Sequence, residues 1–204
     1  MTTMTEISAE AVKRLREQTG AGFMDCKRAL QETAGDVDKA VVLLRERGLA
    51  AAAKKSGREA REGLISSYIH TGGRVGVLIE VNCETDFVAR TDKFQKLVRD
   101  LAIQVAATHP KYVDVTDIPA DVLDAKRTEL LDAADVQSKP DEVKAKIVDG
   151  RLKKWYAEPG AVLLEQPFRD TEQSVRDLVI DAIATIGENI QVRRFERYAL
   201  GEDL

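Results

Sequence analysis

The hydrophobic pattern changes period between residues 75 and 105, and this change restricts the fold more than any other feature of the sequence. Apolar residues first alternate with others at Val75, Val77, Ile79 and Val81. Alternation of this kind predicts a strand with one apolar face. From Asp92 to about Thr108 the spacing becomes three and four, which predicts an amphipathic helix. Its apolar stripe consists of Phe94, Leu97, Val98, Leu101 and Val105, with Ala106 as a further candidate. Because each apolar side must be buried against another element, an α+β core with an antiparallel sheet packed on helices is expected.

The other elements of this core are predicted from turn and cap residues. A hairpin of two strands spans about 64–81, with Gly72 and Gly73 in its turn. A projecting helix hairpin is expected at about 119–156, with its first helix continuing to about Val136. Base rates favour a structural or dimerising role for it over a binding site. A final helix at about 172–186, capped by Thr171, precedes a last strand at about 189–198. The core domain is therefore expected at 56–204.

Residues 1–55 predict a separate domain, a three-helix bundle resembling a ubiquitin-associated domain, with a linker helix at its end. Glycine-containing turns separate three short amphipathic segments. Phe23 and Met24 begin the second helix beside a glycine turn. From the pattern alone, burial in the bundle core and exposure as an apolar contact are equally good interpretations of these two residues.

Composition restricts the class of protein. The 204 residues include 35 acidic and 31 basic ones, a net charge of -4, which argues against a dedicated nucleic-acid binder. No apolar run approaches the roughly 20 residues that span a membrane, and the first residues lack the pattern of a signal peptide. Two cysteines, Cys26 and Cys83, are too few for a disulfide framework. A cytoplasmic protein with two reduced, buried thiols is expected.

Residues 82–90 connect the second strand of the hairpin to the long helix. Cys83, Glu84 and Asp86 in this segment raise the question of a catalytic or metal site. A cysteine nucleophile needs a base, however, and the only histidines, His70 and His109, show no suitable spacing. We therefore expect no enzyme, no metal and no cofactor.

Five parts of the sequence resemble, in order, segments of bacterial translation elongation factor Ts. They are Thr19-Gly20-Ala21-Gly22 with Asp25-Cys26-Lys27-Arg28-Ala29-Leu30, then Asn82-Cys83-Glu84-Thr85-Asp86-Phe87-Val88-Ala89, Arg151-Leu152-Lys153-Lys154, Gln166-Pro167-Phe168, and Gly187-Glu188-Asn189-Ile190 with Val192-Arg193-Arg194. One short motif would mean little, but an ordered set over nearly the whole chain is specific.

The resemblance implies a guanine-nucleotide exchange factor for elongation factor Tu in translation elongation, acting by binding and without covalent chemistry. In the family, the segment matched here by Thr85, Asp86, Phe87 and Val88 enters the GTPase near its magnesium and phosphate site. The aromatic ring, here Phe87, inserts between side chains of the partner, and the magnesium ion is dislocated. The positions of Phe23 and Met24 contact the same GTPase domain, which favours exposure for both.

Only one half bearing Thr-Asp-Phe is present, where long members of the family have two similar units. The chain therefore resembles a short form, and a homodimer through the last strand or the helix hairpin is a hypothesis. The alternative function is a protein-binding adaptor whose N-terminal bundle binds another protein without exchange activity. Phe87 distinguishes the two, because only an exchange factor needs it.

Overall fold

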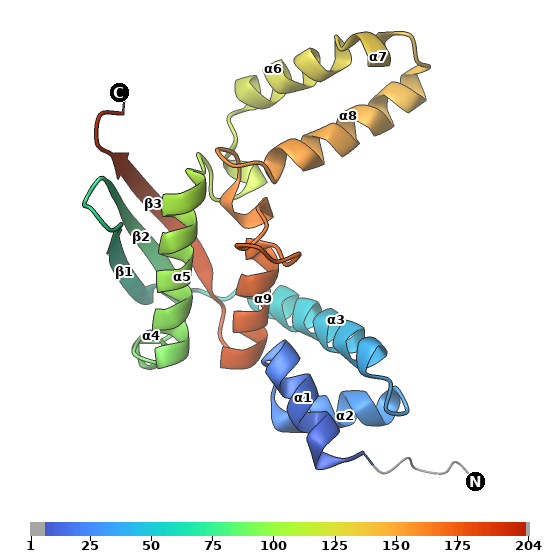
Figure 1. Cartoon of the computed structure of the whole chain (residues 1–204), viewed down its shortest axis with the longest axis vertical. Helices are drawn as coiled ribbons and strands as arrows, with labels where there is room; N and C mark the ends of the chain where they lie inside the picture. The colour runs from blue at the N-terminus through green and yellow to red at the C-terminus, as the bar shows by residue number, and fades with distance from the viewer. Residues whose placement is uncertain (1–6, 203–204) are drawn as a thin grey trace. The chain divides into compact units, whose positions relative to one another are not determined.

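The computed structural model describes residues 7–202 and has an α+β fold with a small antiparallel sheet. Figure 1 labels its helices and strands. In chain order the elements are α1 (Ala9–Thr19), α2 (Phe23–Glu32), α3 (Val37–Lys55), β1 (Glu62–Ile69), β2 (Val75–Cys83), α4 (Asp86–Ala89), α5 (Asp92–Thr108), a 3-10 turn (Val115–Asp117), α6 (Ala120–Leu131), α7 (Ala134–Gln137), α8 (Asp141–Tyr156), a second 3-10 turn (Leu163–Glu165), α9 (Val175–Ile186) and β3 (Gln191–Ala199).

The chain forms two compact units. The first contains residues up to Leu64 together with Val81–Val98 and Asp177–Gln191. The second contains Ile65–Glu80, Arg99–Arg176 and the residues from Val192 on. The predicted division into domains at 1–55 and 56–204 stays a prediction.

Helices α1, α2 and α3 form the predicted three-helix bundle. Ser8 caps α1 by accepting a hydrogen bond from the Ala11 N–H at 3.1 Å, and Asp36 caps α3 through the Lys39 N–H. Gly20 ends α1 with a φ of 68°, a left-handed conformation that favours glycine. The buried core of the bundle consists of Val12, Leu15, Cys26, Ala29, Leu30 and Ala40.

Helix α3 continues through the alanine-rich stretch to Lys55, as alanine propensity predicts. Its far half lies against α9 within the first unit. A Cβ atom built on Gly48 would lie 3.7 Å from the Ala184 Cβ. Two polar contacts add to this packing: Arg45 pairs with Asp177 at 2.6 Å, and the Lys55 ammonium donates to the Ile183 carbonyl.

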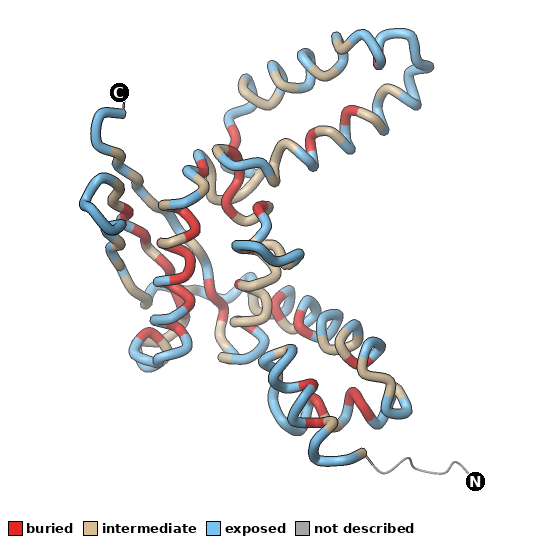
Figure 2. Tube along the Cα trace, viewed as in Figure 1, coloured by how far each residue is buried: buried red, intermediate tan, exposed pale blue. Residues whose placement is uncertain are grey.

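The sheet has the strand order β1-β2-β3, so that β2 is the central strand. Val77, Ile79 and Val81 are buried as the alternation predicted, and Figure 2 shows buried positions along β2 and α5. Gly63 lies so close to β2 that a Cβ atom there would stand 2.2 Å from the Val81 carbonyl oxygen. Glycine is required at this position by close backbone approach.

Helix α5 has the predicted bounds. Its predicted apolar stripe is buried from Phe94 to Val105, whereas the further candidate Ala106 is only half-buried. Thr91 caps it by accepting from the Phe94 N–H. In the second unit α5 is joined to β3, because Arg197 donates to the Ala106 carbonyl. At β3, Arg194 contacts Glu80 of β2 at 2.8 Å.

Three predicted details of the second half are wrong. Helix α6 ends at Leu131 instead of continuing to Val136, because Val136 turns inward on α7 into the core of the helix hairpin. The last helix begins at Val175 and not at residue 172. Thr171 does not cap it: its hydroxyl donates to the Phe168 carbonyl within a turn that precedes the helix.

Candidate partner-binding tip

The segment between β2 and α5 was expected to be a connection, but it contains a single helical turn, α4. We call Glu84–Arg90 the tip. Thr85 is the N-cap of this turn, since its hydroxyl accepts the Val88 N–H at 3.4 Å. The segment forms a helical turn because four non-glycine residues follow the cap residue Thr85. The Ala89 N–H donates to the Thr85 carbonyl, which closes one helical hydrogen bond before α5 begins.

A carboxylate from the far end of the chain holds the start of the tip. Glu188 lies after α9, and one of its oxygens accepts the N–H groups of Glu84 and Thr85, both at 3.0 Å. Its other oxygen accepts the Thr85 hydroxyl at 2.6 Å. In the opposite direction, Glu84 accepts the Asn189 N–H at 2.6 Å. The two segments therefore clamp each other through two carboxylates.

The inner side of the tip is packed. Cys83 and Ala89 are buried, and the Cys83 thiol donates to the Thr85 carbonyl at 3.1 Å. Burial, followed by the negative charge of Glu188, raises the pKa of the Cys83 thiol to about 11. A thiol held neutral in this way is a poor nucleophile. The prediction of two free, buried thiols is confirmed for Cys26 and Cys83.

The outer side of the tip presents one large apolar group. The Phe87 side chain is 78% exposed. Asp86 is not free, because its carboxylate pairs with Arg90 at 2.7 Å on the surface of the same turn. Val88 is half-buried. Of the four predicted contact residues, Phe87 projects, Asp86 is paired beside it, and Thr85 serves the cap.

Phe23 and Met24 stand in the first turn of α2, and both are exposed, at 46% and 60%. The core of the bundle is filled instead by Cys26, Ala29 and Leu30 from the same helix. Of the two interpretations that the sequence allowed, exposure is therefore the one observed. The role of both side chains as contacts with a partner stays a prediction.

No group of three or more His, Cys, Asp and Glu side chains within residues 7–202 has an arrangement that could hold a metal ion. No helix in that range is long and apolar enough to cross a membrane.

Comparison with known proteins identifies the family. The family model described as Elongation factor TS matches residues 9–182. The chain is 55% identical over 199 residues to elongation factor Ts of Thermoanaerobacter sp. (strain X514), with 97% of each chain covered. It is 56% identical over 203 residues to that of Synechococcus elongatus, covering 98% of this chain and 91% of the relative. This chain belongs to the elongation factor Ts family. The predicted resemblance and the elongation-factor class are thereby confirmed.

Sequence reasoning recognised residues 187–190 as a family segment but gave Glu188 no role. The structure shows why that segment matters for the tip: the two meet although 103 residues separate Glu188 from Thr85. The only sign of this contact in the sequence was that both family segments, 82–89 and 187–190, contain a glutamate. Hydrophobic periodicity and local spacing relate residues that are close in the sequence, so they cannot predict a contact between these two segments.

The raised pKa of Cys83 gives a pH-dependent stability. The folded chain keeps the thiol proton up to about pH 11, whereas the unfolded chain releases it near 9.0. The stabilisation is therefore complete below about pH 9 and is lost as the pH rises towards 11. In urea titrations, the free energy of unfolding of the wild type relative to Cys83→Ala should fall by about 2 kcal/mol between pH 8 and pH 10.5. Both proteins share every other titrating group, so a constant difference would contradict the assignment.

Proposed function

We propose that this chain is a guanine-nucleotide exchange factor for elongation factor Tu. It promotes GDP release by inserting Phe87, flanked by Thr85, Asp86 and Val88, near the magnesium and phosphate site of the GTPase. The observation that carries the proposal is the highly exposed Phe87 ring on a clamped helical turn, in a chain of the elongation factor Ts family.

The ring supplies free energy only in the complex. GDP is held in a GTPase by backbone N–H groups, a lysine and Mg²⁺. Displacing the elements that line the nucleotide site would disturb all three. Burying a fully exposed phenylalanine contributes about 2–3 kcal/mol. By reciprocity, this free energy can weaken GDP by roughly 30- to 150-fold if the ring is buried only when the nucleotide site is distorted.

Asp86 has a secondary part in this proposal. Its pairing with Arg90 is exposed on both sides, and such pairs contribute about 1 kcal/mol at most. Breaking the pair is therefore a small cost when the tip meets a partner. Because Arg90 neutralises the carboxylate beforehand, Phe87 is expected to matter more than Asp86.

Phe23 and Met24 are proposed to form a second contact with the same GTPase. Their exposure on a bundle whose core is filled by other residues supports this role. As parts of the same proposal, the protein acts in the cytoplasm, uses no cofactor, metal or nucleic acid, and catalyses no covalent chemistry. An adaptor without exchange activity is the competing function, and it would not need the Phe87 ring.

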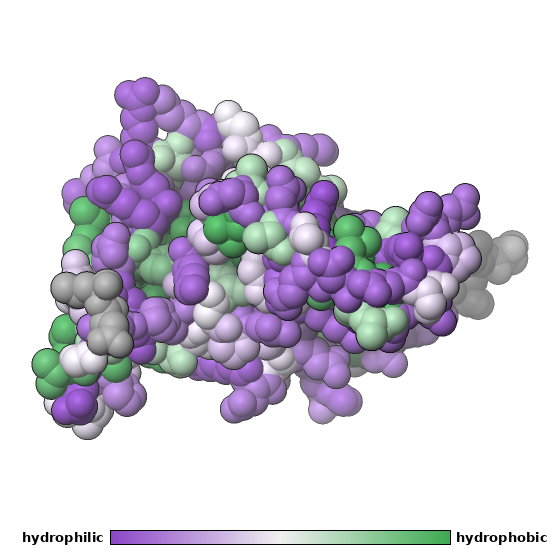
Figure 3. Space-filling view, turned by 90° about the horizontal axis from the view of Figure 1, so that it is seen from above, coloured by the Kyte–Doolittle hydropathy of each residue, from purple (hydrophilic) through white to green (hydrophobic). Residues whose placement is uncertain are grey.

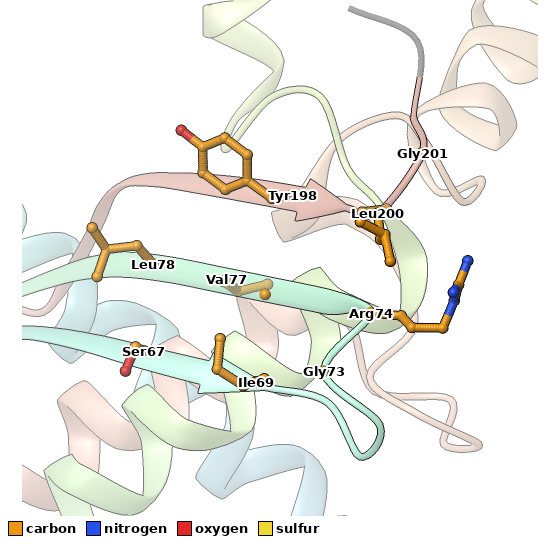
Figure 4. A pocket seen from close by; sticks show the side chains of 11 residues that line it. Ser67, Ile69, Gly73, Arg74, Val77, Leu78, Tyr198, Leu200 and Gly201 are labelled. Atoms are coloured by element: carbon orange, nitrogen blue, oxygen red, sulfur yellow. The ribbon is translucent and has the colours of Figure 1, made fainter.

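We also propose a homodimer, formed through the outer face of the sheet. Large apolar side chains are exposed there on all three strands, and they line the shallow groove seen in Figure 4. These residues are Ile69, Leu78, Tyr198 and Leu200. Figure 3 shows apolar surface at the left, on the side where Figure 1 draws the sheet. A face of this kind suits a self-complementary contact between two copies.

The helix hairpin is the weaker of the two dimer surfaces. Its main apolar residues, Val136, Val148 and Leu152, are buried in its own core. A second copy would therefore gain less apolar area on the hairpin than on the sheet. The proposed interface is accordingly the sheet face, to which the last strand contributes Tyr198.

Replacing the Phe87 ring should abolish most of the exchange activity. Phe87→Ala is expected to reduce the acceleration of GDP release from elongation factor Tu by about 30-fold or more, because the burial free energy is lost. Release of a fluorescent GDP analogue measures this, with Val42→Ala, another exposed apolar position, as the control. Wild-type protein that leaves the release rate unchanged would refute the exchange proposal and favour the adaptor.

Truncating Met24 should weaken the complex but leave the insertion of the Phe87 ring intact. Met24→Ala is expected to raise the Kd for nucleotide-free elongation factor Tu by about tenfold. GDP release at saturating concentration should stay near the wild-type rate, because Phe87 is intact. Calorimetry gives the Kd and the fluorescent assay gives the rate; an unchanged Kd would remove Met24 from the contact.

Light scattering decides the oligomeric state. Wild-type protein at micromolar concentration should have twice the 22.5 kDa mass of the chain. Tyr198→Glu should shift it to the monomer by placing a charge on the sheet face, whereas Leu131→Glu on the hairpin should leave it dimeric. A monomeric wild type would refute the dimer. A monomer for Leu131→Glu with a dimer for Tyr198→Glu would place the interface on the helix hairpin instead.

A further inference from the structure

The turn after α9 contributes the carboxylate of Glu188 to the tip. Gly187 ends α9 with a φ of 94°, so the chain reverses and Glu188 leaves the helix axis. The next two residues, Asn189 and Ile190, are both only 2% exposed. The Asn189 side chain donates to the Arg58 carbonyl at 2.7 Å. Glu188 is thus attached to a segment that is itself fixed on both sides.

Glu188 acts on the tip through the Thr85 hydroxyl. That hydroxyl donates its proton to Glu188 at 2.6 Å, which leaves its lone pairs to accept the Val88 N–H. The direction of the first bond therefore orients the oxygen for the second. Removing the carboxylate frees the hydroxyl to rotate and also leaves the N–H groups of Glu84 and Thr85 without this acceptor. Hydrogen bonds to an ionised acceptor are stronger and shorter than neutral ones.

We propose that Glu188 is a positioning residue for nucleotide exchange, which fixes the angle at which α4 presents Phe87. The inference rests on the proposed function, because it assigns Glu188 a part in the insertion of that ring. In this role Glu188 acts through the Thr85 hydroxyl on the turn. A ring that is already held at its binding angle loses less conformational entropy on insertion than one on a mobile segment.

Amide hydrogen exchange of the isolated protein tests the structural half of the proposal. In Glu188→Ala, the amides of Glu84, Thr85 and Val88 should exchange at least tenfold faster than in the wild type. In Glu188→Gln the effect should be smaller, since the amide oxygen can still accept the two N–H groups. Protection of Leu30, in the bundle core, should be unchanged in both. Unchanged exchange at residues 84–88 in Glu188→Ala would overturn the proposal.

A double-mutant cycle tests the functional half. Glu188→Ala should reduce the acceleration of GDP release by about tenfold in the wild-type background and by less than twofold in the Phe87→Ala background. A merely destabilising substitution would cause the same loss in both backgrounds, and that result would overturn the assignment. Glu188→Gln should restore part of the rate. Glu172→Ala, which removes an exposed carboxylate elsewhere, should have no effect in either background.

The two halves also separate this inference from the proposed function. If the wild type does not accelerate GDP release, the exchange proposal fails and a positioning role in exchange fails with it. Amide exchange then still decides whether Glu188 holds the turn. If the wild type accelerates release and the cycle is additive, the exchange proposal stands and only the role of Glu188 is lost.

Discussion

The tip depends on a reciprocal pair of carboxylates. Glu188 accepts two backbone N–H groups and a hydroxyl from residues 84–85, and Glu84 accepts the N–H of Asn189 in return. A chain that leaves a strand and starts a helical turn has backbone donors that neither element satisfies. Here a charge on the opposite segment satisfies them. The clamp therefore fixes where α4 begins, and the direction of Phe87 follows from it.

Within this short turn, different residues serve folding and the proposed contact. Cys83, Thr85 and Ala89 face inward and stabilise the turn, whereas Phe87 faces outward and contributes little to folding because it stays exposed. A single exposed aromatic residue needs no functional explanation by itself. Phe87 differs from such a residue because its exposed ring stands on a rigid support in a chain of the elongation factor Ts family.

How much the sequence predicts depends on the range of the interaction involved. The bounds of α5 and the buried face of β2 follow from periodicity over a few residues, and both predictions are confirmed. The family could be recognised because several short segments occur in order. The start of α9 could not be predicted, since Thr171 is equally suited to a cap and to the turn that it occupies. Nor could the role of Glu188, which depends on a contact across more than 100 residues.

Within the first unit, α9 connects the two surfaces that are proposed to bind the partner. The bundle carrying Phe23 and Met24 is held to α9 through α3, at Gly48 and by the pairing of Arg45 with Asp177. The tip is held to the turn that follows α9, through Glu188. Both surfaces are thus mounted on the same helix. If both contact one GTPase domain, their spacing is set before binding, and the second contact forms at a lower entropic cost than it would on a flexible linker.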